Sequence, residues 1–164
     1  SGELDYLVVD MPPGTGDVQL SLAQLVPVTG AVLVTTPQEV SMQDVRKAFH
    51  MFEKVRVPVM GFVENMSYFV CDGCDKRHFL FGKDGGVLLA KKFHTDLLAQ
   101  LPMIPAVREG GDLGRPVMAQ ENLDGAVSMF TTPFRDLARK VAQRVSILNV
   151  RNRAQSEVQI GSFQ

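Results

Sequence analysis

Short apolar runs recur along the chain, and each is followed by a polar or amphipathic stretch. Several of the runs contain β-branched residues and have the length of buried strands. They cover residues 6–9, 31–34, 58–63 and 97–102. Because polar positions rarely interrupt them, these runs predict four strands that are largely buried.

The stretches between the runs carry the signals of helices. Residues 41–54 place large apolar side chains at helical spacing, with polar side chains between them. Residues 18–26 and 87–93 are typical of shorter helices, the first of them largely buried. Strands that alternate with helices imply right-handed crossovers and a parallel sheet. The predicted fold is therefore α/β, a doubly wound and mostly parallel sheet with flanking helices.

Apolar positions of helical period continue between residues 123 and 145. Pro133 falls within this stretch, and Thr132 before it is a good N-cap. The pattern therefore predicts a break followed by a long helix over about residues 133–146. Residues 151–164 are polar and aperiodic, so we expect a disordered tail there and the α/β domain in residues 1–150.

Residues 65–86 interrupt the alternation of strands and helices and predict an irregular loop. This segment contains both cysteines of the chain, Cys71 and Cys74, and ends in a glycine pair. Loops of this length inside a compact domain are usually functional. The segment is therefore the first candidate for a site.

Composition narrows the classes of protein. The chain has 164 residues, so a single domain is expected. Its formal net charge is -1, which gives no reason to expect binding to nucleic acid or to an anionic membrane. No apolar run is long enough for a transmembrane helix. Two cysteines are too few for a disulfide scaffold, and no signal peptide is visible, so we expect a cytoplasmic protein.

Residues 10–17 read Asp-Met-Pro-Pro-Gly-Thr-Gly-Asp. The predicted strand 6–9 delivers Asp10 to a turn that Pro12 stiffens and that Gly14 and Gly16 allow to approach a ligand closely. Nucleotide-binding α/β proteins place a Mg²⁺-facing carboxylate in this way. The plain alternative for Asp17 is to cap the following helix, and it has equal weight.

The sequence of residues 10–17 resembles the switch II region of the Mrp/ApbC group of P-loop ATPases. That group belongs with MinD and ParA, and its members are iron–sulfur cluster carriers. Further stretches follow in the order found in that group: Val63-Glu64-Asn65-Met66-Ser67, Cys71-Asp72-Gly73-Cys74, residues 81–86 and residues 108–116. The resemblance extends from the first residues to about Val150.

The resemblance implies a site for ATP and Mg²⁺. Asp10 would be the catalytic carboxylate that holds a Mg²⁺-bound water, and the main-chain N–H of Gly14 would sense the γ-phosphate. The rest of the expected phosphate-side turn is Pro12, Thr15, Gly16 and Asp17. Asn65 follows a strand at its carboxyl end, and its amide matches an adenine edge in hydrogen-bonding groups. The resemblance assigns Asn65 to adenine, whereas a simple turn role is the alternative.

Cys71 and Cys74 have the spacing of a pair that binds one metal centre, but they supply only half of a tetrahedral zinc site or of a four-cysteine cluster site. His78 makes a zinc site with two cysteines and one histidine conceivable, although a fourth ligand is missing. A redox pair is a further alternative, although that motif should open a helix. The resemblance implies a [4Fe–4S] cluster completed by the same pair of a second subunit, and hence a homodimer.

These 164 residues contain no Walker A motif. The resemblance therefore implies the carboxyl-terminal part of a P-loop domain, which we expect not to hydrolyse ATP efficiently alone. The leading hypothesis is an ATP-binding carrier that delivers iron–sulfur clusters to recipient apoproteins. The alternatives are a nucleotide-switched regulator similar to MinD and ParA, and a zinc-stabilised interaction module without catalysis.

Overall fold

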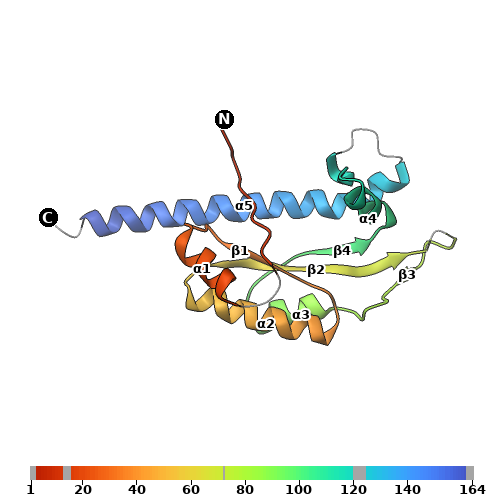
Figure 1. Cartoon of the computed structure of the whole chain (residues 1–164), viewed down its shortest axis with the longest axis horizontal. Helices are drawn as coiled ribbons and strands as arrows, with labels where there is room; N and C mark the ends of the chain where they lie inside the picture. Colours follow the sequence, from red (N-terminus) through yellow and green to blue (C-terminus); the bar gives the residue numbers. More distant parts are fainter. Residues whose placement is uncertain (1–2, 13–15, 72, 120–124, 162–164) are drawn as a thin grey trace.

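A four-stranded sheet forms the centre of the computed structural model (Figure 1). The structure describes residues 3–12, 16–71, 73–119 and 125–161, and the side chains of these residues except those of 125–130 and 153–161. The strands are β1 (Ala31–Thr35), β2 (Val59–Val70), β3 (Arg77–His78) and β4 (Leu97–Met103). β2 pairs in parallel with β1 and β4 and antiparallel with the short β3. The predicted α/β class and mostly parallel sheet are confirmed.

Helices cover both faces of this sheet. The face shown below the sheet in Figure 1 is covered by α1 (Asp17–Leu25), α2 (Glu39–Lys54) and α3 (Gly85–Lys92). The long α5 (Gly125–Gly161) lies along the opposite face. The chain reaches it from β4 through α4 (Pro105–Asp112) and the 3₁₀ turn η1 (Val117–Ala119). None of the helices among the described residues has the length and apolar character needed to cross a bilayer.

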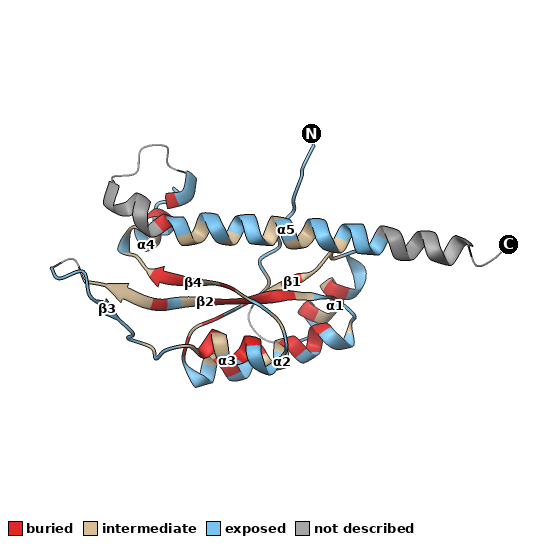
Figure 2. Cartoon of the chain, turned by 180° about the vertical axis from the view of Figure 1, so that it is seen from behind, coloured by how far each residue is buried: buried red, intermediate tan, exposed pale blue. Residues whose placement is uncertain are grey.

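The larger core lies between the sheet and α2 and α3, where burial is concentrated (Figure 2). Phe49 of α2 stacks on Phe93 with ring centroids 4.1 Å apart, and Phe62 of β2 lies beneath this pair. Gly61 has a φ of +154°, and a Cβ there would lie 2.7 Å from the carbonyl oxygen of Asp96. Only glycine therefore lets β2 and the start of β4 approach this closely.

The apolar run at residues 6–9 is not a buried strand, so that prediction is wrong. Residues 3–10 are exposed, with Val8 at 87% and Leu7 at 78% relative exposure (Figure 2). An apolar run becomes a buried strand only when a neighbouring strand accepts its backbone hydrogen bonds, and within the described part of the chain none pairs with it. Of the described residues before α1, Met11 packs against the larger core.

β2 extends well beyond the predicted strand 58–63, so the prediction of an irregular loop from residue 65 is wrong over its first part. The strand continues to Val70 and then turns back into β3, which makes a β-hairpin of residues 69–78. Its pairing with β4 is irregular between Glu64 and Tyr68, where Met66 has a φ of +53°. Residues 65–67 therefore form a bulge inside a continuous strand.

Several helix predictions also need correction. α1 is mostly exposed rather than buried, with Leu25 at 82% exposure. Gly16 is the N-cap of α1 and Asp17 its first residue, so the capping role considered for Asp17 is wrong. α4 occupies part of a segment expected to be a loop.

α5 does not begin near residue 133 or end near residue 146 as predicted. It contains Pro133 in its interior and continues through residues 151–161, where we expected a polar tail. The Nζ atom of Lys140 donates a hydrogen bond to the carbonyl oxygen of Leu98 at 2.7 Å, and Arg144 pairs with Asp96. These contacts with β4 and its preceding turn stabilise the helix on the sheet beyond the proline.

Candidate functional site

Two groups of predicted site residues are connected by one strand, β2. Asn65 lies in the bulge in the middle of the strand, and Cys71 directly follows its last residue. The six residue steps from Asn65 to Cys71 correspond to at most about 20 Å of strand. β2 therefore carries the candidate adenine residue and leads directly into the turn that holds the candidate metal ligands.

The β2–β3 hairpin brings the two cysteines together. The main-chain N–H groups of Asp75 and Cys74 donate hydrogen bonds to the carbonyl oxygen of Cys71 at 2.9 and 3.3 Å. The main-chain N–H of Cys71 donates a hydrogen bond to the carbonyl oxygen of Lys76 at 3.0 Å. Asp75 has a φ of +54°, which closes this tight turn. The turn folds Cys74 back over Cys71, and the two thiols are not joined by a disulfide.

His78 joins the cysteines because of the hairpin register. It pairs with Phe69, which is two residues before Cys71 on the same strand. Residues two apart on a strand point to the same face, so Cys71 and His78 are diagonal neighbours on one face of the hairpin. The Sγ atoms of Cys71 and Cys74 and a ring nitrogen of His78 lie within 4.8 Å of one another. Cys71 is half-buried, whereas Cys74 and His78 are exposed.

Asn65 shapes the bulge in β2. Its Oδ1 atom accepts a hydrogen bond from the main-chain N–H of Met66 at 2.9 Å. This hydrogen bond supports the left-handed backbone conformation of Met66. A residue other than glycine adopts that conformation only at a cost in free energy. The turn role considered for Asn65 is therefore visible in the structure, while its role toward adenine stays a prediction.

Glu64, next to Asn65, is a buried carboxylate that the sequence did not single out. It is 0% exposed and accepts three hydrogen bonds. The donors are Ser67 Oγ at 2.5 Å, Gly86 N at 2.6 Å and Gln100 Nε2 at 2.9 Å. Gly86 lies in the first turn of α3 and Gln100 lies on β4, so one side chain joins the bulge to two neighbouring elements. The only sequence signal was an acidic residue directly after an apolar run.

The phosphate-side residues belong to the amino-terminal segment and the start of α1 rather than to β2. Asp10 and Pro12 are exposed, and Asp10 forms no hydrogen bond or ion pair with other described residues. The carbonyl oxygen of Pro12 accepts a hydrogen bond from Gln19 of α1 at 2.9 Å. Gly16 and Asp17 are exposed at the start of α1, and Gly14 and Thr15 lie outside the described residues. The structure thus leaves the predicted nucleotide roles of these residues untested.

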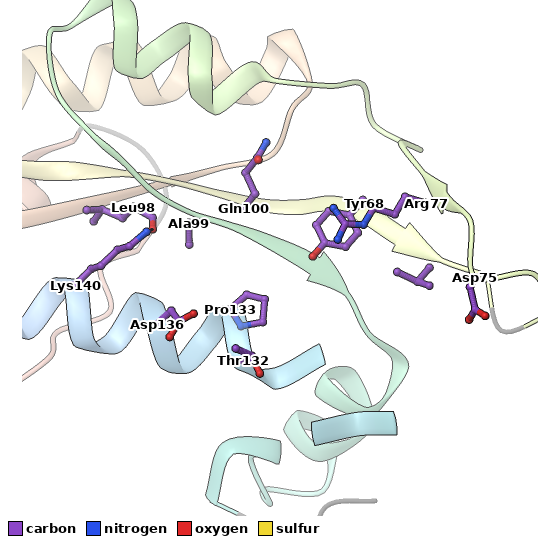
Figure 3. Close-up of a pocket in the computed structure, with 11 residues that line it drawn as sticks. Tyr68, Asp75, Arg77, Leu98, Ala99, Gln100, Thr132, Pro133, Asp136 and Lys140 are labelled. Atoms are coloured by element: carbon purple, nitrogen blue, oxygen red, sulfur yellow. The ribbon is translucent and has the colours of Figure 1, made fainter. Parts of the chain in front are cut away.

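A groove of about 540 Å³ lies between α5, the sheet and the β2–β3 hairpin that carries the cysteines (Figure 3). Gln100 and Lys140 line one part of it, and Tyr68 and Arg77 line the part toward the hairpin. The Arg77 guanidinium stacks over the Tyr68 ring at 4.5 Å from its centroid. None of the described residues predicted for nucleotide or metal binding lines this groove.

Comparison with known proteins places these features in a family. Residues 1–142 match the family described as ParA, NUBPL iron-transfer P-loop NTPase. The iron-sulfur cluster carrier protein of Salmonella typhimurium is 50% identical over 143 residues, which are 87% of this chain and 38% of the relative. The chain thus spans well under half the length of this curated relative.

Two solved structures share the fold. The nucleotide-binding protein from Archaeoglobus fulgidus, in complex with ADP and with cobalt found in it, is 40% identical, with a TM-score of 0.64 over 79% of this chain and 52% of that one. The cell division ATPase MinD of Pyrococcus furiosus, 23% identical with a TM-score of 0.50 over 70% of this chain and 43% of that one, shows the fold alone. The family match covers most of the chain and includes the cysteine hairpin. The chain therefore belongs to the NUBPL iron-transfer group of the ParA P-loop NTPase family.

Proposed function

We propose that this chain forms the cluster-holding and adenine-facing part of a nucleotide-linked iron–sulfur carrier. The observation that supports this most directly is the pair of thiols of Cys71 and Cys74, which the hairpin holds close together and near the surface. Thiolates are the usual protein ligands of iron–sulfur clusters. The proposed cargo is a cluster that is taken up at the hairpin and passed to recipient apoproteins.

The number of thiols sets the proposed assembly. A [4Fe–4S] cluster with four cysteine ligands needs twice what one hairpin supplies. A second copy of the chain, related by a two-fold axis beside the hairpin, would supply the same pair. The hairpin is free of covering helices in the described structure and lies at one end of the molecule, which leaves room for that copy (Figure 1). We therefore propose a homodimer that forms around the cluster.

The nucleotide part of the proposal rests on two observations. A structural relative was solved with ADP, and Asn65 lies on a parallel strand within the half of the sheet where open α/β proteins bind ligands. Asn65 would contact adenine. Asp10 would hold a Mg²⁺-bound water, and Pro12, Gly14, Thr15, Gly16 and Asp17 would form the turn around the phosphates. A cytoplasmic location also stays part of the proposal.

Anaerobic reconstitution with iron and sulfide tests the cluster function. We expect broad absorbance near about 400 nm, as cysteine-ligated clusters show, together with a shift from monomer to dimer in size-exclusion chromatography. Cys71→Ser and Cys74→Ser should each lose both signals. Asp75→Asn is the matched control, because asparagine tolerates the left-handed turn and both thiols remain.

Other outcomes would contradict the proposal. Stoichiometric zinc without any cluster would favour a zinc-stabilised module, and partner binding without either metal would favour a MinD-like regulator. Cluster absorbance that survives in both cysteine variants would show that the cluster lies elsewhere.

A further inference from the structure

The hairpin holds three metal-ligating side chains in a single copy of the chain. The ligand atoms of Cys71, Cys74 and His78 lie within 4.8 Å of one another. Two of these residues are the thiols assigned above to a cluster shared by two copies. The third is a histidine that such a cluster does not need.

The strand register of the hairpin places His78 beside the two cysteines. The ladder pairs Phe69 with His78 and Val70 with Arg77, so His78 shares a face with Cys71, whereas Arg77 points to the other face. Arg77 lies over the ring of Tyr68, which is also on that other face. The arrangement keeps the guanidinium off the ligand face, where a positive charge would oppose a bound cation.

The distances between the three ligand atoms come close to those around a small tetrahedral ion, and a slight approach of the side chains would make them match. Zn–S bonds of about 2.3 Å at tetrahedral angles separate two sulfur ligands by about 3.8 Å, and a sulfur and a nitrogen ligand by slightly less. The observed limit of 4.8 Å exceeds this by about 1 Å, which side-chain rotation can supply because Cys74 and His78 are exposed. Two thiolates and a neutral imidazole also balance the charge of a divalent ion.

We propose that one copy of the chain binds a single thiophilic divalent ion, Zn²⁺ or Co²⁺, through Cys71, Cys74 and His78. Sulfur and imidazole nitrogen are the donors that zinc prefers, and cobalt takes the same geometry. Three protein ligands leave the fourth tetrahedral position open to water or to a thiolate from another molecule, as in zinc sites with an exchangeable ligand. This single-ion site shares both thiols with the cluster proposed above, but it needs neither a second copy nor sulfide.

Anaerobic titration of the full chain with Co²⁺ tests the site. We expect one ion per monomer, with the visible absorption of tetrahedral cobalt and sulfur-to-cobalt charge transfer. His78→Ala should weaken Co²⁺ and Zn²⁺ binding at least about tenfold, since it removes a ligand, and should shift the visible bands. His50→Ala is the matched control, because His50 is exposed on α2 and far from the hairpin in the sequence. Thermal melts without metal verify that both variants fold.

Parallel reconstitution with iron and sulfide separates this inference from the proposed cluster function. His78→Ala should keep the cluster absorbance, because the four thiolates of two copies suffice, while Cys71→Ser should lose both the cluster and the single ion. If the wild type binds cobalt one-to-one but forms no cluster, the cluster function fails and the single-ion site stands. Unchanged affinity and spectrum in His78→Ala, or one cobalt per two chains, would overturn the single-ion site.

Discussion

Glu64 offers a quantitative test of how β2 is held in place. In Glu64→Leu the side-chain volume is nearly kept, but the acceptor of three hydrogen bonds is removed from a site with 0% exposure. The most consequential donor is the main-chain N–H of Gly86. It lies in the first turn of α3, where N–H groups have no partner within the helix.

The local cap of α3 does not replace Glu64. The N-cap residue Asp84 is in the left-handed conformation and makes no side-chain hydrogen bond to the helix. Glu64 reaches Gly86 from a strand 22 residues away and places a carboxylate at the positive end of the helix dipole. It therefore performs from a distance the task that an N-cap residue usually performs.

The expected cost follows from these contacts. A buried donor left without a partner costs about 1–3 kcal/mol, and Ser67 and Gln100 lose their bonds as well, although both side chains can rotate toward other acceptors. We expect Glu64→Leu to lower the free energy of unfolding by about 3–5 kcal/mol. Glu64→Gln should cost only about 1–2 kcal/mol, because its oxygen can face Gly86 while its amide group faces Ser67 and a flipped Gln100.

Urea denaturation followed by circular dichroism measures both variants against the wild type. With an m-value of about 2 kcal/mol per molar, the midpoints of the leucine and glutamine variants should differ by about 0.5–2 M. Glu53→Gln, at an exposed position of α2, is the control and should stay within about 0.5 kcal/mol of the wild type. Equal losses below about 1 kcal/mol for both Glu64 variants would refute the view that this carboxylate fastens β2 to α3.

Two further predictions concern the same side of the sheet. Gly86→Ala should destabilise the protein by about 1–3 kcal/mol in the urea assay, because its Cβ would lie 2.9 Å from Glu64 Cβ and from Leu97 Cδ1. The control is Gly111→Ala in α4, where an added Cβ would have nothing within 4 Å. Equal losses of stability in the two variants would contradict the packing argument. The hydrogen bond from Arg46 holds the pKa of Glu39 below its ordinary value of 4.5, so this contribution to stability is present above that pH and is lost as the pH falls through the lowered pKa. An NMR titration of Arg46→Ala should show the pKa of Glu39 rising, and an unchanged value would contradict this assignment.

The sequence predicts well those elements whose pattern is set by local packing. β1, α2, α3 and β4 lie close to the predicted ranges because each has a clear apolar run or helical period. The run at residues 6–9 has an equally clear pattern but stays exposed. A local pattern of residues indicates that a segment can form a strand. Whether that strand is buried depends on a neighbouring strand or helix, about which the local pattern says nothing.

The parts of the site that escaped prediction depend on contacts between distant residues. The extension of β2 to Val70 depends on pairing with β3 and β4, and the position of His78 beside Cys71 depends on that register. Glu64 meets Gly86 and Gln100 at separations of 22 and 36 residues. The spacing of Cys71 and Cys74, by contrast, was readable directly, because a tight turn over four residues is a local feature.

The bulge at residues 65–67 divides β2 into two parts with different constraints. Before it, β1 and β4 hold the strand on both sides, and Glu64 ties it to α3. A slip of this part by one residue would exchange the side chains of its two faces, both of which are buried, and would break their packing. Beyond the bulge, the part of the chain that the structure describes supports the strand that leads to the cysteines by short pairings with β3 and the end of β4. The part of β2 that leads to the cysteines is therefore less constrained than the part before the bulge.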